Sequence, residues 1–446
     1  MSNRQYFGTD GVRGEVGTHP MTPDFALKLG WAAGTVLLRD GGREVLLGKD
    51  TRLSGYMFEA ALEAGFAAAG ATVRFLGPIP TPAVAYLTRT FRAAAGVVIS
   101  ASHNPYTDNG FKFFTPEGFK LTDQQEAEIE ALLDEPLKIT NTNAIGRASR
   151  VDDALGRYIE YIKASVPMEV RFSGMKIALD CANGAGYKLA PQALKELGAD
   201  VVTLGVEPNG LNINEGVGAT SLDALQALVV QEGCDLGIAL DGDADRVMLV
   251  DHRGNVVDGD GVLYLLASNR VKRGLPLKGV VGTLMTNLGL QAALRDQFGL
   301  PMLRADVGDR YVIEQMRKHE WELGGESSGH IILSDRSTTG DGLLAAVQVL
   351  VTLCREEKTL AEAMENYRAF PQILKNVVVK DKSVIMSDEH LLAFVDQAKA
   401  YLGNSGRVLL RPSGTEPKIR VMVEADRQEL AVEWCDKIID EVKSRV

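Results

Sequence analysis

The sequence contains little cysteine, and its cysteines lack the spacing of a structural site. The 446 residues include four cysteines, Cys181, Cys234, Cys354 and Cys435, and no CxxC pair. This pattern is typical of free thiols in a reducing compartment and argues against a disulfide framework or a zinc site. The first residues also lack the apolar segment of a secretory signal, so we expect a cytoplasmic protein.

Long apolar runs and several well-known nucleotide and metal motifs are missing as well. The longest apolar stretch, GLLAAVQVLVTLC from Gly342, is too short to cross a bilayer and predicts a buried helix. The chain has no GxxxxGK[ST] phosphate loop and no HExxH zinc motif. Acidic residues outnumber basic ones, 59 to 48, which gives a net charge of −11. Nucleic acid and anionic membranes are therefore poor partners, and an anionic ligand would need local basic residues or a metal ion.

Three segments share one pattern of apolar strand, Gly-containing loop, amphipathic helix and second apolar strand. They begin at Glu44, Lys176 and Gly279, and the third is the loosest match. The pattern predicts parallel βαβ units, whereas the residues after Pro371 predict a small α+β domain with an antiparallel sheet. We therefore expect an α/β protein of four domains: three similar α/β domains with mixed sheets and a smaller C-terminal α+β domain. The predicted bounds are 1–152, 153–254, 255–368 and 369–446.

The first segment with chemical potential is AAAGVVISASHNPYTDNGFKFF, residues 93–114. Its small and β-branched run predicts a buried strand that ends in a cluster of Ser, His and Asn, at the sheet edge where ligands bind. Ser102 is therefore a candidate nucleophile or carrier of a covalent group, and the alternative is an ordinary serine turn. The pair Asn109 and Gly110 predicts a second tight turn, which would present Lys112.

The second segment, LGIALDGDADRVMLVD, brings three carboxylates together between two apolar strands. Asp241, Asp243 and Asp245 repel one another unless a cation neutralises them, and oxygen ligands with an open position favour Mg²⁺. An EF-hand is excluded, because Arg246 stands at the sixth position and His252 at the twelfth. The alternative is a solvated acidic turn.

Two further loops are candidates for binding a sugar phosphate. In GGESSGHIIL, Glu326 and Ser328 could contact sugar hydroxyls, although a structural turn explains this loop and the similar VGDRYV segment equally well. In RPSGTEPKIR, backbone N–H groups and two guanidinium groups could form a phosphate pocket, against the alternative of a plain hairpin turn. Near the N-terminus, Arg13, Lys49 and Arg52 add basic loop residues.

Together these segments resemble the α-D-phosphohexomutase superfamily over essentially the whole chain, and within it the bacterial phosphoglucosamine mutases. The phrases that carry the resemblance are FGTDGVRG, ISASHNPYTDNGFKFF, DCANGAG, NINEGVGATS, VGDRYV, GESSGH and RPSGTEPKIRVMVE. The resemblance implies four domains around a central cleft, with the C-terminal domain as a mobile lid. The chain has Ala244 in the metal loop where glycine is frequent in the family, which leaves the carboxylates in place.

The resemblance also implies roles for individual residues. Ser102 would be phosphorylated in the active enzyme and would hold one Mg²⁺ per subunit together with Asp241, Asp243 and Asp245. The implied catalytic set is completed by Lys112, Arg13 and His103. The implied substrate contacts are Glu326, Ser328, Arg246, Arg411, Ser413, Gly414, Thr415 and Arg420.

The reaction implied by the resemblance converts D-glucosamine 6-phosphate to D-glucosamine 1-phosphate. A phosphoserine enzyme would act through bound glucosamine 1,6-bisphosphate, which also primes unphosphorylated enzyme, and the product would feed UDP-N-acetylglucosamine synthesis. Three alternatives stay open: a sibling mutase for mannose or glucose phosphates, a metal-dependent sugar phosphatase, and a sugar-phosphate binder without catalysis. The expected partner is a small sugar phosphate, and a homodimer is left open.

Overall fold

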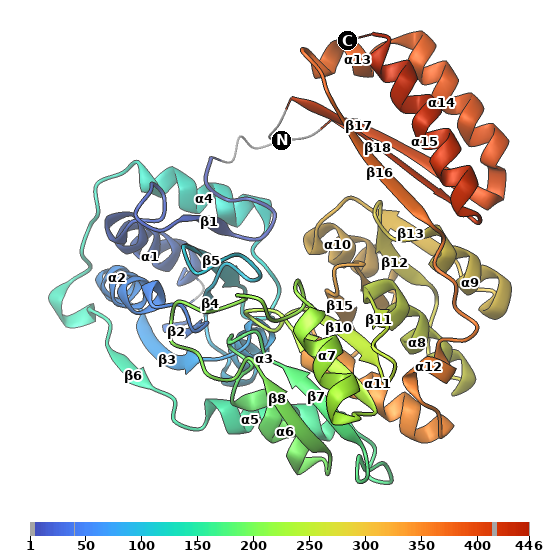
Figure 1. The fold of residues 1–446 in the computed structure, drawn as a ribbon. Helices are drawn as coiled ribbons and strands as arrows, with labels where there is room; N and C mark the ends of the chain where they lie inside the picture. Colours follow the sequence, from blue (N-terminus) through green and yellow to red (C-terminus); the bar gives the residue numbers. More distant parts are fainter. Residues whose placement is uncertain (1–4, 40, 413–416, 446) are drawn as a thin grey trace. The chain divides into compact units, whose positions relative to one another are not determined.

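The computed structural model describes residues 5–39, 41–412 and 417–445, and its chain forms two compact units (Figure 1). The first unit comprises residues 1–285 and 302–364, and the second comprises residues 286–301 and 365–446. Within the described residues, no helix is long and apolar enough to cross a membrane.

The first unit contains three mixed sheets. The first sheet has the spatial order β1 (Val12–Glu15), β5 (Asp108–Phe114), β4 (Ala95–Ile99), β2 (Glu44–Lys49), β3 (Thr72–Pro78) and β6 (Ala148–Arg150). The second has the order β11 (Val256–Val257), β10 (Val247–Asp251), β9 (Leu236–Leu240), β7 (Lys176–Asp180) and β8 (Asp200–Leu204). The third has the order β13 (Met302–Ala305), β12 (Val280–Thr283), β14 (Leu323–Gly325) and β15 (Ile331–Leu333).

Helices accompany each of these sheets. Those of the first are α1 (Pro23–Leu37), α2 (Ser54–Ala69), α3 (Thr81–Phe91) and α4 (Asp123–Leu133). The next along the chain are α5 (Ala154–Ala164), α6 (Leu189–Glu196) and α7 (Asp223–Glu232). They are followed by α8 (Gly259–Lys272), α10 (Asp309–His319), α11 (Gly342–Glu356) and α12 (Leu360–Ala363). The apolar run from Gly342 is confirmed as a buried helix, which Asp341 caps by accepting a hydrogen bond from Leu344 N–H at 2.9 Å.

The three sheets repeat one plan. In each, two parallel strands joined by a helix confirm the predicted βαβ unit: β2 with β3, β7 with β8, and β12 with β13. A third strand then pairs in parallel with the first, and the chain returns in an antiparallel strand: β4 to β5, β9 to β10, and β14 to β15. The predicted serine, metal and sugar loops are these three return connections, so they occupy equivalent positions at the carboxyl ends of parallel strands.

The second unit has the predicted α+β character. Its antiparallel sheet has the order β16 (Gln372–Val378), β18 (Lys418–Ala425) and β17 (Gly406–Pro412). Its helices are α9 (Leu288–Phe298), α13 (Lys382–Met386), α14 (Glu389–Leu402) and α15 (Gln428–Lys443). The fully buried carboxylate of Glu424 anchors α9, because it accepts from Leu288 N–H at 3.0 Å and pairs with Arg407 at 2.6 Å.

One predicted turn is wrong. Asn109 and Gly110 lie inside β5, where they pair with Gly14 and Arg13 of β1. The chain reverses earlier, and Asp108 N–H donates to the Pro105 carbonyl at 3.1 Å. Pairing with a strand nearly a hundred residues away overrides the local turn preference of an Asn-Gly pair.

Close packing of α1 against α2 generates a prediction about stability. A Cβ atom at Gly65 would lie 2.0 Å from the Leu27 carbonyl oxygen and 2.7 Å from Trp31 N, so Gly65→Ala must force the two helices apart. We expect a loss of about 1–3 kcal/mol in the free energy of unfolding, seen as a lower midpoint in urea. The matched control is Gly156→Ala in α5, where no atom lies within 4 Å of the new Cβ and a gain of about 1 kcal/mol is expected. Equal midpoints for the two variants would contradict this account of the packing.

Candidate active site

Ser102 lies where the loop after β4 meets the loop after β9. Its side chain is buried, and its hydroxyl donates a hydrogen bond of 2.6 Å to Oδ2 of Asp241. The backbone of Ser102 is in the left-handed region, with φ of +51°, a conformation that residues other than glycine adopt only when surrounding contacts hold it. Nδ1 of His103 lies 3.4 Å from the same hydroxyl oxygen.

Two donors from different sheets hold the serine loop in this conformation. The Arg52 guanidinium donates to the carbonyl oxygens of Ser102 and Asn104 at 3.2 and 2.6 Å, and the Asn214 amide donates to the same oxygens at 2.9 and 3.0 Å. Arg52 is fully buried and paired with Asp50. Arg52 is therefore a basic loop residue, as predicted, and its side chain acts on the backbone of the serine loop. Lys49 is likewise engaged, by Glu59.

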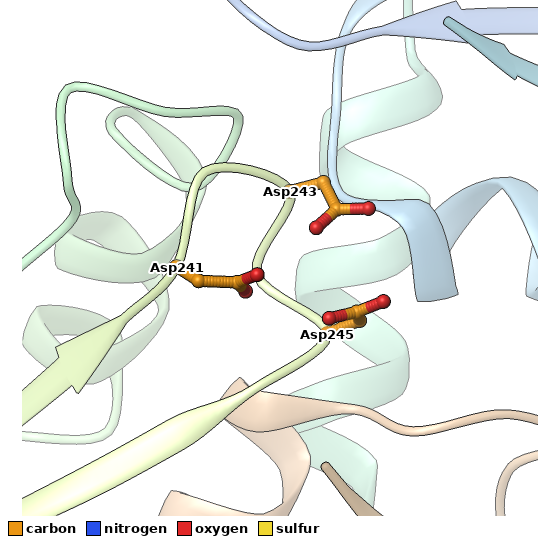
Figure 2. Close-up of side chains that lie close together, drawn as sticks. All are labelled: Asp241, Asp243 and Asp245. Carbon is orange, nitrogen blue, oxygen red and sulfur yellow. The ribbon is translucent and has the colours of Figure 1, made fainter. Parts of the chain in front are cut away.

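The metal loop is a tight connection between two buried strands. Asp241 and Asp243 are fully buried and Asp245 nearly so, and in Figure 2 the three side chains point toward a common space. Ala244 has φ of +57°, which explains the family's frequent glycine at this position. A Cβ at Gly242 would lie 2.5 Å from the Ser102 carbonyl oxygen, so the close approach of the two loops requires glycine there.

The donor set of this loop fits a hard divalent cation. One carboxylate oxygen from each aspartate lies within 4.8 Å of the others, and the Oδ1 atoms of Asp243 and Asp245 are buried without a hydrogen-bond partner among the described residues. Burial, with the charges of Asp245 and Asp243, raises the pKa of Asp241 to about 8. A cation bound here would remove this penalty, and carboxylate oxygens with open positions are the ligands that Mg²⁺ prefers.

Basic residues surround the carboxylates. The Lys112 ammonium, carried on β5, donates to Oδ2 of Asp243 at 2.7 Å and to Oδ2 of Asp245 at 3.1 Å. Burial alone would lower the pKa of Lys112, but nearby carboxylates outweigh it and raise the pKa well above its ordinary value. Arg13, on β1, pairs with Asp10. The pKa of His103 is lowered to about 4 by burial and by the positive charges of Arg246 and Arg13, so the ring is neutral at pH 7.

The sugar loop connects β14 to β15 and lies against the metal loop. Arg246 forms an isolated bridge with His330, and Val247 N–H donates to the Gly329 carbonyl at 2.9 Å. Glu326 is half-buried and accepts from Gly308 N–H at 3.0 Å, whereas Ser328 is exposed. Both side chains predicted to contact a sugar therefore lie on the loop that adjoins the carboxylate cluster.

The predicted phosphate loop is only partly described. Arg411 of β17 and Arg420 of β18 are directly opposed in the sheet register, so two cationic side chains share one face of adjacent strands. Like charges in this arrangement repel, which an anion between them would relieve. The other predicted members, Ser413, Gly414 and Thr415, lie outside the described residues.

Sequence reasoning missed several residues that build this site. Thr81, at the start of α3, donates to Oδ2 of Asp243 at 2.5 Å, and Arg52 and Asn214 clamp the serine loop. Asp10 lies 3.1 Å from Lys112. Asp10 and Asn214 belong to the phrases FGTDGVRG and NINEGVGATS, which carried the family resemblance but suggested no contact for either residue.

Comparison with known families finds four domain families that match consecutive parts of the chain. Four matching domain families are described as phosphoglucomutase/phosphomannomutase alpha/beta/alpha domain I (residues 4–139), domain II (156–254), domain III (258–370) and C-terminal domain (374–441). The phosphoglucosamine mutase of Mannheimia succiniciproducens is 54% identical over 444 residues. Those of Cronobacter sakazakii and Escherichia coli O7:K1 are 56% and 55% identical over 445 residues, and all three alignments cover 100% of both chains.

Solved structures share the fold at lower identity. A phosphoglucomutase/phosphomannomutase family protein of Burkholderia thailandensis aligns with a TM-score of 0.81 and 24% identity, over 98% of this chain and 97% of that one. The N-acetylphosphoglucosamine mutase of Aspergillus fumigatus, solved in complex with GlcNAc-6P and magnesium, aligns with a TM-score of 0.73 and 19% identity, over 99% and 96%. With all four domains in order and full-length relatives at more than half identity, the chain belongs to the phosphoglucosamine mutase family of the α-D-phosphohexomutases.

Proposed function

We propose that this chain, an isomerase by family, interconverts D-glucosamine 6-phosphate and D-glucosamine 1-phosphate in the cytoplasm, with Ser102 as the phosphoryl carrier. The observation that carries the proposal is the contact between the Ser102 hydroxyl and the buried carboxylate of Asp241 at 2.6 Å. A phosphoryl group on this hydroxyl would stand directly against three carboxylates that need a cation. Four cysteines outside any disulfide support a reducing compartment.

The same contacts argue against a phosphatase that uses an aspartate as its nucleophile. Asp241 accepts hydrogen bonds at both oxygens, from the Ser102 hydroxyl and from Arg246 N–H at 3.1 Å. One oxygen of Asp243 already accepts from both Thr81 and Lys112. A carboxylate so engaged is held as a ligand and is poorly placed to attack phosphorus, whereas the Ser102 hydroxyl has one carboxylate contact, to Asp241.

Asp241, Asp243, Asp245 and an oxygen of phosphorylated Ser102 would hold one Mg²⁺. When bound, the ion would neutralise charge on the phosphoryl group, which is the main requirement of phosphoryl transfer. Lys112 adds a fixed positive charge beside Asp243, and Arg246 adds one beside Asp241, where burial lowers and the carboxylates raise its pKa, with the net shift upward.

The chain's groups define a two-step transfer. Phospho-Ser102 gives its phosphoryl group to O1 of glucosamine 6-phosphate, and the serine oxygen regains a proton. The resulting glucosamine 1,6-bisphosphate turns end for end and its 6-phosphoryl group returns to the oxygen of Ser102. The serine proton passes to O6, and glucosamine 1-phosphate leaves. Glu326 and Ser328 would hold the sugar hydroxyls in both orientations, because each side chain can hydrogen-bond more than one hydroxyl. The same bisphosphate would prime unphosphorylated enzyme.

The opposed arginines of the second unit support a site for the phosphate that is not reacting. Arg411 and Arg420 are paired across β17 and β18, and Asn376 of β16 follows in the same row. Guanidinium groups bind phosphate through paired hydrogen bonds, which fix orientation as well as charge. We propose that they act together with Ser413, Gly414 and Thr415.

The experiment that tests the reaction compares three substrates. Glucosamine 6-phosphate, mannose 6-phosphate and glucose 6-phosphate are incubated with enzyme, Mg²⁺ and the matching 1,6-bisphosphates, and both sugar 1-phosphate and free phosphate are quantified. We expect glucosamine 1-phosphate as the dominant product with little free phosphate. A preference for mannose or glucose phosphate would contradict the proposed substrate. Free phosphate as the dominant product would contradict the mutase reaction and indicate a phosphatase.

Replacing the proposed carrier tests the phosphoserine. Ser102→Ala should lower mutase turnover by at least roughly a thousandfold, because the variant lacks the hydroxyl that contacts the carboxylate cluster through Asp241. Intact-protein mass spectrometry after treatment with glucosamine 1,6-bisphosphate should detect one phosphoryl group on the parent chain and none on the variant. Ser149→Ala, on the edge strand β6, is the control and should keep both activity and labelling. Wild-type turnover in Ser102→Ala would exclude the mechanism.

Replacing one proposed metal ligand tests the cation site. Asp243→Asn keeps an oxygen for Thr81 and Lys112 but removes one charge, so the Mg²⁺ concentration for half-maximal activity should rise by at least about tenfold. Isothermal titration calorimetry with Mg²⁺ should show the same loss of affinity. Asp152→Asn removes an equal charge from an exposed position and should leave both measurements unchanged. An unaltered Mg²⁺ titration in Asp243→Asn would remove Asp243 from the site.

A further inference from the structure

Six side chains, four of them buried and two half-buried, form a closed ring beside the carboxylate cluster in which nitrogen groups alternate with carboxylates. In order around the ring they are Lys112, Asp10, Lys120, Asp309, His330 and Asp245. The Lys112 ammonium lies 3.1 Å from both Asp10 and Asp245, and the Lys120 ammonium contacts Asp10 and lies 2.5 Å from Asp309. Nε2 of His330 lies 3.3 Å from Asp309, and Nδ1 lies 3.7 Å from Asp245.

The ring joins residues of all three sheets of the first unit. Lys120 and Asp10 flank the first sheet, Asp245 belongs to the metal loop, and Asp309 begins α10. Lys120 connects two distant parts of the chain within this ring. Its single ammonium is shared by the carboxylates of Asp10 and Asp309, which are 299 residues apart in the sequence.

We propose that Lys120 is a positioning residue of phosphoryl transfer: by holding Asp10 and Asp309 at fixed places, it orients Lys112 on one side and His330 on the other. This inference rests on the proposed function, since Lys112 and the metal loop are the groups that it positions. Lys120 itself takes no part in bond making; its side chain is occupied by the two carboxylates and only 12% exposed.

The charges make this arrangement strongly dependent on Lys120. Burial would lower the pKa of Lys120, but Asp10 and Asp309 outweigh burial and keep its pKa above the ordinary value, so the ammonium stays charged. Without this charge, Asp10 and Asp309 would both lose the ammonium that they share, and the loss of a partner by a carboxylate largely removed from water is costly. Asp10 would then draw Lys112 away from Asp243 and Asp245, and His330 would lose its fixed neighbour.

A second ion pair between the same segments provides a matched control. Arg310, the residue after Asp309, donates to both oxygens of Glu126 in α4 at 3.0 and 2.9 Å. Glu126 is buried, and this pair also joins the first sheet's helices to α10, but neither residue belongs to the ring. A general weakening of the contact between these segments should therefore appear in Glu126→Gln as well.

The experiment compares Lys120→Met, the double variant Lys120→Met with Asp309→Asn, and Glu126→Gln in the full-length enzyme. For Lys120→Met we expect kcat with glucosamine 6-phosphate to fall at least about tenfold while KM changes less than about threefold, as for loss of an orienting partner. The double variant also removes the charge of one of the two carboxylates that lost Lys120, and it should recover part of the lost kcat. Glu126→Gln should keep kcat and KM near the parent values even where its melting temperature falls as far as that of Lys120→Met.

Mg²⁺ binding tests the role of Lys120 independently of turnover, and therefore independently of the proposed mutase reaction. In Lys120→Met, release of Lys112 from the aspartates should strengthen Mg²⁺ binding by calorimetry at least about threefold, with return toward the parent value in the double variant. Unchanged kcat and Mg²⁺ affinity in Lys120→Met would overturn the proposal, as would an equal loss in Glu126→Gln. Failure of the double variant to recover would also overturn it, because Lys120 would then act on the substrate directly. If the parent enzyme proved not to be a mutase, the Mg²⁺ measurements would still decide.

Discussion

The cost of burying negative charge governs the whole first unit. Asp241, Asp243 and Asp245 are removed from water on one short loop, and unpaired carboxylates in such surroundings are strongly disfavoured. Each nearby feature reduces that cost: the Ser102 hydroxyl donates to Asp241, and Thr81 and Lys112 donate to Asp243. Among the described residues, the Oδ1 atoms of Asp243 and Asp245 have no hydrogen-bond partner, which leaves them for a cation. The site is therefore built so that folding and metal binding satisfy the same atoms.

The repeated topology of the three sheets brings the groups of the site together. Each of the three sheets returns its chain in an antiparallel strand after a strand that is parallel to its neighbour, and each return loop carries one part of the site. Main-chain contacts then tie the loops together: Thr81 N–H donates to the Asp243 carbonyl, Val247 N–H to the Gly329 carbonyl, and Gly342 N–H to the Ala244 carbonyl. A loop held by neighbouring sheets at its backbone can keep a strained residue such as Ser102 in place without relying on its own sequence.

Local patterns in the sequence predicted the elements and the chemistry-bearing loops well. The run that became β4 is apolar on both faces and stops abruptly at Ser100, and the aspartates of the metal loop stand between two such runs, so strand ends and loops could be located without tertiary information. The turn expected at Asn109 and Gly110 failed because β1 pairs with that segment. The contacts of Arg52 could not be predicted for a related reason, since its partners are backbone oxygens about fifty residues away.

Lys120 illustrates the limit of such reasoning. In the sequence it is one lysine among 48 basic residues, with no neighbour that marks it. Its significance arises only when α10 brings Asp309 to it across 189 positions, a distance at which periodicity and spacing carry no information. The resemblance to a family identified the phrases around Asp10 and Asp309 but not the ion pairs that connect them.

Burial separates the residues that we propose for phosphoryl transfer from those that we propose for sugar recognition. Ser102, Lys112 and the three aspartates are buried and held by several contacts each, so a change in any one disturbs the others. Glu326 is half-buried and Ser328 is exposed on the loop surface, where substitution disturbs less packing. If the proposed function holds, substitutions at these two residues can alter sugar preference with little effect on the buried carboxylate cluster, so we place the preference for an amino sugar outside that cluster.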